Sequence, residues 1–250
     1  MADDTDQGNG PPSAGGLTPA EAGAREELAQ RLDRVIRIDL RPMASPMPMG
    51  FIGLAAATLV LSSFNLGLVP TSEAHTVALV MITFVFPLQG SAAIFGMLTR
   101  DGVAATAMAI LSGTWLTVGL VMLTSPAGST SDALGVLLIV SAICMLLPAL
   151  GASLGKLVVT VVLSTAALRL ATSAIYQLTA STTWQTITGW IGVILFLFAV
   201  YAALASLLEN VQGRTVLPMG RRRKGRMAVE GGLTEQVIDV THEPGVRAQL

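Results

Sequence analysis

The sequence predicts an all-α integral membrane protein, folded as a six-helix transmembrane bundle with both termini in the cytoplasm. Three observations support this prediction: composition, the length of the apolar segments, and the placement of basic residues. Of the 250 residues, 52% are hydrophobic and only 12% are charged. A soluble domain of this size would carry about a quarter charged residues, so the composition indicates a membrane protein.

Six apolar segments each reach the length of about 20 residues that a helix needs to cross a bilayer. Short connections with turn-forming residues separate them, for example Arg100-Asp101-Gly102 and Ser125-Pro126-Ala127-Gly128. The predicted spans cover residues 49–70, 77–98, 103–125, 132–153, 157–179 and 185–208.

The distribution of Lys and Arg predicts the orientation of the bundle. The loops after the first, third and fifth spans contain neither residue, whereas Arg100 and Lys156 follow the second and fourth spans. Most other basic residues flank the spans, including Arg41 before the first and the run 221–224 after the last. If the chain crosses the membrane six times, all of these residues lie on the same side, so both tails are expected on the cytoplasmic side.

The predicted transmembrane domain covers residues 45–220, and the segments outside it are polar. Residues 1–16 have little apolar surface to bury, and we expect them to be disordered. Residues 17–41 place apolar side chains at helical spacing among charged ones, which indicates an amphipathic helix on the membrane surface. A solvated, partly helical arm is the alternative for this segment. Residues 221–250 are basic and then polar, and we expect a disordered cytoplasmic tail.

No residue pattern indicates catalysis, a cofactor or a metal, so we do not expect an enzyme. Cys144 is the single cysteine and lies in an apolar run, so a Cys/His cluster is excluded. The stretch from Gly151 to Lys156 differs from a phosphate-binding loop in its spacing, and no strand precedes it. Nucleic acid is not an expected partner.

A few polar residues interrupt the predicted spans. Arg169 falls near the centre of the fifth span, where an arginine costs about 2.5–3.5 kcal/mol on insertion scales. Its side chain must therefore face the bundle interior or water and find an acceptor. It could act as a counter-charge for an anion in a pore, or pair structurally with backbone carbonyls or a neighbouring subunit. Asn65 and Gln89 are expected to form hydrogen bonds between helices.

The first span opens with two prolines, Pro46 and Pro48. Because proline disfavours helix in the residue before it, the helix is predicted to start near Met49 or Gly50. The unpaired N–H groups and positive dipole end of a first turn would suit an anion. An ordinary proline-marked helix start at the interface is the simpler interpretation.

These motifs resemble the acetate uptake transporter family, also called the succinate–acetate permease or Gpr1/Fun34/YaaH family. The family's Asn-Pro-Ala-Pro-Leu-Gly-Leu is similar to Ser-Pro-Met-Pro-Met-Gly-Phe at residues 45–51. Its Asn-Ala-Gly corresponds to residues 65–67, and its second-helix Gln to Gln89. The last helix and its exit are similar to Gly-Trp-Ile-Gly at 189–192 and Gly-Arg-Thr-Val-Leu-Pro-Met-Gly at 213–220.

The resemblance implies six helices per protomer around a narrow pore, commonly assembled as a hexamer in the cell inner (plasma) membrane. By ungapped counting, the bulky residues that narrow the family's pore fall on Leu54, Leu111 and Ala166, which predicts a wider and more aliphatic constriction. Arg169 would attract the carboxylate, and Asn65 and Gln89 would offer hydrogen bonds. The residues expected to shape the cytoplasmic mouth are Pro46, Met47, Pro48, Met49 and Gly50.

The leading functional hypothesis is a membrane permease or channel for acetate or another small monocarboxylate or anion, with or without proton coupling. The expected partners are this anion, the lipid bilayer and further copies of the chain. A non-transporting membrane protein, such as an assembly or sensory partner that retains the fold, is the alternative. Departures from the family motif, such as Ser45 in place of the leading Asn, and the basic tail would suit this alternative.

Overall fold

The computed structural model describes Gly23, Glu27 and residues 44–222. The chain divides into one unit up to Pro42 and a second unit that contains the helix bundle, which is described here by itself. Gly23 and Glu27 are helical and exposed. The predictions for residues 1–16, for the rest of 17–41, and for 223–250 lie outside the described residues.

Within the described residues, six helical spans are long and apolar enough to cross a membrane, as the sequence predicts. The second span is composite: the 3-10 turn η1 (Thr71–Glu73), α3 (Ala74–Val80), the π-helical η2 (Met81–Val85) and α4 (Phe86–Leu98) follow one another. The other spans are α2 (Met47–Asn65), α5 (Gly102–Thr124), α6 (Asp132–Ser153), α7 (Leu157–Thr179) and α8 (Thr182–Gln212).

The prediction that the first helix begins near Met49 or Gly50 is wrong by two or more residues. Pro46 adopts helical dihedral angles as the N-cap of α2, and Pro48 lies in its first turn. A first turn accommodates proline because its N–H groups have no intrahelical acceptor. The same helix ends at Asn65, earlier than the predicted residue 70, and Gly67 follows with a left-handed φ of 74°.

Further helix boundaries differ from the prediction: the second span begins at Thr71 instead of residue 77, and the last begins at Thr182 instead of residue 185. The last helix continues to Gln212, past the predicted residue 208, and Gly213 then ends it with a φ of 64°.

Within the second span, the π-helical turns of η2 end immediately before α4, and Pro87 lies in the first turn of α4. Proline has no N–H to complete the α-helical bond pattern, and this favours a local change of helix type.

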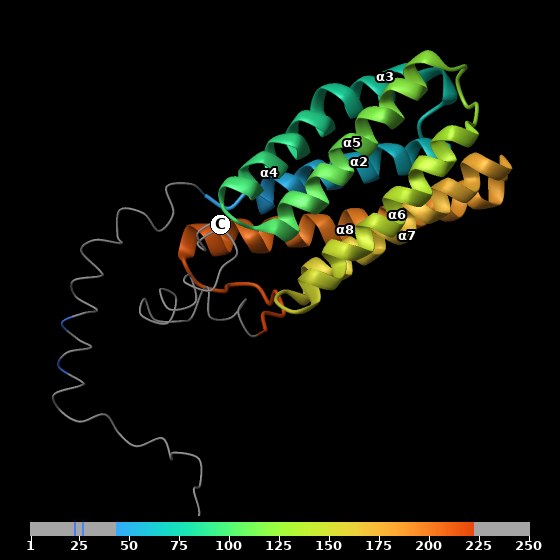
Figure 1. The fold of residues 1–250 in the computed structure, drawn as a ribbon. Helices are drawn as coiled ribbons and strands as arrows, with labels where there is room; N and C mark the ends of the chain where they lie inside the picture. The colour runs from blue at the N-terminus through green and yellow to red at the C-terminus, as the bar shows by residue number, and fades with distance from the viewer. Residues whose placement is uncertain (1–22, 24–26, 28–43, 223–250) are drawn as a thin grey trace, which may run out of the picture. The chain divides into compact units, whose positions relative to one another are not determined.

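The six spans form a closed ring in which each packs on its neighbours in chain order, and α8 packs on α2. Figure 1 shows the helices running side by side as one bundle. Small residues permit the closest approaches. At Gly96, for example, a Cβ atom would lie 2.9 Å from the backbone nitrogen of Ala105, so α4 and α5 pack backbone to backbone.

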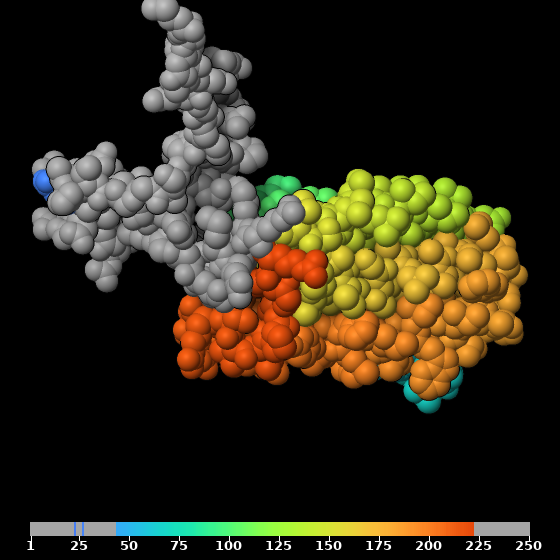
Figure 2. All heavy atoms as spheres, turned by 90° about the horizontal axis from the view of Figure 1, so that it is seen from below, coloured from blue at the N-terminus to red at the C-terminus, as the bar shows by residue number. Residues whose placement is uncertain are grey.

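After α8, residues 213–222 form a segment, here called the return segment, that closes one end of the bundle. It runs back to the start of α7, and Figure 2 shows its orange-red atoms against the yellow atoms of that region. The amides of Leu157 and Val158 donate to the carbonyls of Gly220 (3.2 Å) and Met219 (3.3 Å). The return segment thereby satisfies N–H groups at the α7 N-terminus that have no partner within the helix.

Side chains hold the return segment in place as well. The Arg221 guanidinium pairs with the Glu209 carboxylate of α8. The Tyr201 hydroxyl donates to the Pro218 carbonyl (3.0 Å). The Arg222 amide donates to the Gly155 carbonyl (2.8 Å). Arg221 and Arg222 therefore pack on the helix bundle, although the sequence analysis assigned both residues to the tail.

Candidate functional site

The bundle contains a cavity of about 80 Å³, here called the outer cavity, near the ends of α2, α5, α6 and α7 that lie away from the return segment. The loop between α5 and α6, residues 125–129, closes part of it. The helical residues that line it include Leu61, Asn65, Trp115, Val118, Leu138, Arg169, Leu170, Ser173, Tyr176 and Gln177.

A second cavity of about 130 Å³, here called the inner cavity, lies beside the α4–α5 and α6–α7 loops. It is lined by the first residue of α2 and by residues from α5, α6 and α7. The set comprises Met47, Asp101, Val103, Gly151, Ala152, Gly155, Lys156 and Val159. The basic loop residue Lys156 thus lies at the end that the sequence predicts to face the cytoplasm.

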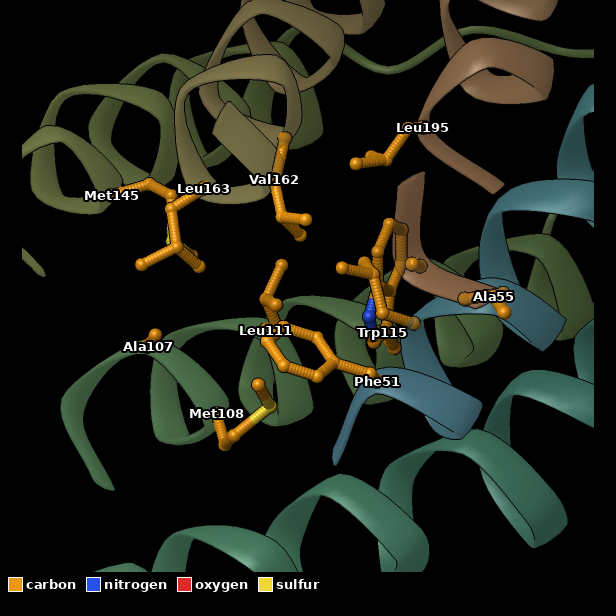
Figure 3. Packing of buried hydrophobic residues seen from close by; sticks show 14 of the residues in the cluster. Phe51, Ala55, Ala107, Met108, Leu111, Trp115, Met145, Val162, Leu163 and Leu195 are labelled. Atoms are coloured by element: carbon orange, nitrogen blue, oxygen red, sulfur yellow. The ribbon is translucent and has the colours of Figure 1, made fainter. Parts of the chain in front are cut away.

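Buried apolar side chains, here called the apolar layer, separate the two cavities. On α2, Phe51 and Leu54 fall between the inner-cavity residue Met47 and the outer-cavity residue Leu61. On α5, Met108 and Leu111 lie between Val103 and Trp115, and on α7, Leu163 and Ala166 lie between Val159 and Arg169. Figure 3 shows the Phe51 ring beside Leu111 and close to Met108.

Arg169 lies where the outer cavity meets the apolar layer. It is only 2% exposed, and its Cζ atom stands 5.6 Å from the centre of the Trp115 ring. This distance permits a cation–π contact. The Arg169 Nε has no hydrogen-bond partner, and no carboxylate among the described residues forms a salt bridge with the guanidinium. Arg169 is thus a buried cation without a counter-charge in this part of the chain.

Other polar atoms near Arg169 also lack partners. The Ser62 hydroxyl and the Trp115 indole nitrogen are both buried and form no hydrogen bond within the described structure. Gly192 of α8 brings Ser62 and Arg169 together, because a Cβ atom there would clash with the Ser62 Oγ and lie 2.6 Å from the Arg169 Nε. The result is a cluster of donors from three helices, α2, α5 and α7, packed against Gly192 of α8.

The predicted site residues separate into several groups in the structure. Asn65 lines the outer cavity together with Arg169. Gln89 lies elsewhere, where its Nε2 donates to the Gly50 carbonyl (3.2 Å), and its Cγ would lie 2.8 Å from a Cβ at Gly53. Gln89 therefore joins α4 to α2. Leu54, Leu111 and Ala166 belong to the apolar layer.

The proline motif at the start of α2 has little capacity to bind an anion through its backbone. Pro48 has no N–H, the Met47 amide is 3.4 Å from the Ser45 hydroxyl, and the Gly50 amide donates to the Pro46 carbonyl (3.1 Å). Of the five predicted mouth residues, only Met47 lines the inner cavity. Pro46, Pro48 and Gly50 are buried and Met49 is half-buried.

Sequence reasoning did not identify Phe51, Ser62 or Trp115 as site residues. Trp115 is buried beside Arg169. Phe51 brings an aromatic ring into a layer that was expected to be aliphatic. The family motif at residues 45–51 carries a signal for Phe51, whereas a serine in an apolar run gives none for Ser62.

Six membrane helices in a closed ring, with cavities on both sides of a narrow apolar layer, are typical of a channel or transporter for small solutes. The described residues contain no group of three or more His, Cys, Asp or Glu side chains that could hold a metal ion.

The family model described as "GPR1/FUN34/yaaH family" matches residues 32–220, and the chain belongs to this family. The motif resemblance is therefore confirmed. Among its relatives is the succinate-acetate/proton symporter SatP of Escherichia coli K12, which is 27% identical over 186 residues, or 71% of this chain and 96% of the relative. The SatP of Shigella flexneri matches equally well.

A solved structure of the bacterial acetate channel SatP matches the bundle with a TM-score of 0.64 and 27% sequence identity. The match covers 71% of this chain and 99% of the solved chain. The all-helical, six-span fold is thus shared with a channel of known structure.

Proposed function

We propose that the protein is a permease or channel for acetate or another small monocarboxylate in the cell inner (plasma) membrane. The observation that carries this proposal is the match to relatives named as acetate symporter and acetate channel over almost their whole length. The cavities at both ends of the apolar layer support it. No enzymatic activity is proposed.

The path we propose runs along the axis of the helix ring. A small solute enters the outer cavity past Asn65, crosses the apolar layer, and reaches the inner cavity near Met47. In the layer, Phe51, Leu54 and Leu111 are completely buried, so side-chain motion has to open the passage. An apolar constriction of this kind excludes water and ions until it opens.

A side-chain proton relay through the membrane centre does not form part of the proposal. In the described bundle, the acidic residues and the histidine lie at or near the ends of the spans, as with His75, Asp101 and Glu209. Glu209 is paired with Arg221. A proton that accompanies the solute would have to travel on the solute itself.

We also propose that the protein forms a homo-oligomer, with the hexamer expected from the family resemblance. Native mass spectrometry of the detergent-purified protein tests this assembly directly. A predominant mass of six protomers is the expected result, and a stable monomer at all protein concentrations would contradict it.

Transport itself is tested with the full-length protein reconstituted into liposomes. We expect uptake of radiolabelled acetate that saturates with concentration and exceeds uptake by protein-free liposomes. Liposomes that contain heat-denatured protein serve as the control. If no monocarboxylate of one to four carbons shows protein-dependent uptake, the transport proposal is wrong and a non-transporting role is favoured.

A further inference from the structure

We propose that Arg169, together with Ser62 and the indole N–H of Trp115, forms a binding site for the carboxylate group of a small monovalent anion. Arg169 and Trp115 line the outer cavity where its polar entrance meets the apolar layer, and Ser62 lies beside Arg169 at Gly192. This inference rests on the proposed function and specifies the form of the substrate that binds at this site: the deprotonated anion.

The charge of Arg169 is the first argument. A guanidinium stays protonated in proteins, so burial does not remove its charge. An unpaired buried charge is strongly unfavourable. In the described part of the chain Arg169 has the Trp115 ring on one side and no carboxylate partner. An anion from solution that enters the outer cavity would supply the missing counter-charge.

The unpaired donors are the second argument. The Arg169 Nε, the Ser62 hydroxyl and the Trp115 Nε1 are buried without hydrogen-bond partners in the described structure. A buried donor that lacks an acceptor is rare and unfavourable. A carboxylate accepts about four hydrogen bonds through its two oxygens. The chemistry of the cluster therefore complements a carboxylate.

The size and lining of the outer cavity limit the ligand. A cavity needs about 10–15 Å³ to hold one water molecule, so the outer cavity of about 80 Å³ has room for a small anion. Arg169 is the only charged residue that lines it among those described, and Leu61, Val118 and Leu138 offer apolar contacts. A second carboxylate would find no cation there, so we expect monocarboxylates to bind better than dicarboxylate dianions.

Binding can be measured on the full chain without any transport. Replacing Trp184 and Trp190 by Phe leaves Trp115, which contacts Arg169, as the only tryptophan. The purified protein is titrated with sodium acetate while sodium gluconate, whose anion is bulkier and more hydrophilic, keeps the ionic strength constant. Trp115 fluorescence and thermal stability are followed, because a ligand that binds only the folded state raises the melting temperature.

We expect saturable changes in both signals with acetate. Arg169→Gln should weaken binding about tenfold or more, as expected for the loss of a charge-assisted pair. Ser62→Ala should have a smaller effect, and Arg169→Lys should restore part of the affinity. The succinate dianion should bind about tenfold or more weakly than acetate if a single cation sets the selectivity. The exposed Arg214→Gln is the matched control and should bind like the parent protein.

The outcomes separate this inference from the proposed function. Equal acetate binding by Arg169→Gln and the parent protein, or no acetate binding by the parent protein at all, would overturn the anion site. If uptake into liposomes persists in either case, the transport proposal stands. Binding that depends on Arg169 without any uptake would instead leave the site intact and overturn transport. Equal binding of succinate and acetate would overturn the assignment to monovalent anions.

Discussion

At the scale of single residues, Gly192 determines how closely Arg169 and Ser62 approach α8. Because a Cβ at Gly192 would lie 2.6 Å from the Arg169 Nε and would clash with the Ser62 Oγ, both side chains must move in Gly192→Ala. We expect this variant to bind acetate about tenfold more weakly, a loss typical of a misplaced charge-assisted contact.

The control for this prediction is Gly113→Ala on α5, where a Cβ atom would meet no atom within 4 Å. Circular dichroism and the elution volume should be unchanged in both variants, since a single methyl group leaves the helix ring intact. Unaltered acetate affinity in Gly192→Ala would show that the position of Arg169 is unimportant for binding.

The buried charge of Arg169 also leads to a prediction about the stability of the fold. In the absence of a bound anion, a buried cation without a counter-charge destabilises the folded state. Arg169→Met should therefore raise the free energy of unfolding by about 1–3 kcal/mol in anion-free buffer, in the range seen when buried charges are replaced by apolar residues. A melting temperature measured in detergent checks this.

A lower melting temperature for Arg169→Met would contradict this prediction. Arg169 would then have a structural role, such as pairing with backbone carbonyls or with a neighbouring subunit. Arg214→Met, at an exposed position of the return segment, controls for the general effect of losing a positive charge.

At the scale of elements, the return segment links the end of α8 to the start of α7. The Glu209–Arg221 pair anchors it, and both side chains are about 10% exposed, so solvent screens the pair only partly. We expect Arg221→Gln to lower the free energy of unfolding by about 1–3 kcal/mol, because it removes the paired guanidinium from a largely buried carboxylate.

A double-mutant cycle with Glu209→Gln measures the strength of this pair. The two substitutions should be non-additive, since each removes the same interaction. Additive effects would indicate that the return segment is held mainly by its backbone hydrogen bonds to Gly155, Leu157 and Val158.

The elements were largely predictable from the sequence, whereas their ends and the site were less so. Long apolar segments define membrane helices, and all six spans were predicted on that basis. The start of α2 was misplaced because Pro46 and Pro48 were treated as helix breakers, although a first turn accepts proline. The π-helical turn at η2 leaves no mark in hydropathy.

For the site, Arg169 was identifiable because a charge within a span is rare. Its neighbours were not identifiable, since Ser62, Trp115 and Gly192 come from three other helices, and only the packing of the ring brings them together. Packing also sets the places of Gln89 and Asn65: Gln89 forms the expected interhelical hydrogen bond, to Gly50 of α2, whereas Asn65 lines the outer cavity.

At the scale of the whole molecule, the closed ring positions one cavity on each side of the apolar layer. The layer consists of side chains from α2, α5 and α7, so the passage lies within one protomer in this account. Leu111 is completely buried in the layer, and Figure 3 shows it next to the Phe51 ring.

The most direct test of this passage is radiolabelled acetate flux into liposomes that contain Leu111 variants. We expect Leu111→Trp to abolish protein-dependent flux because it adds bulk to a filled layer, and Leu111→Ala to increase flux because it opens the layer. Leu120→Trp, on the exposed face of the same helix, should match the parent protein. Equal flux in the parent protein, Leu111→Trp and Leu111→Ala would contradict a pathway through the centre of the helix ring.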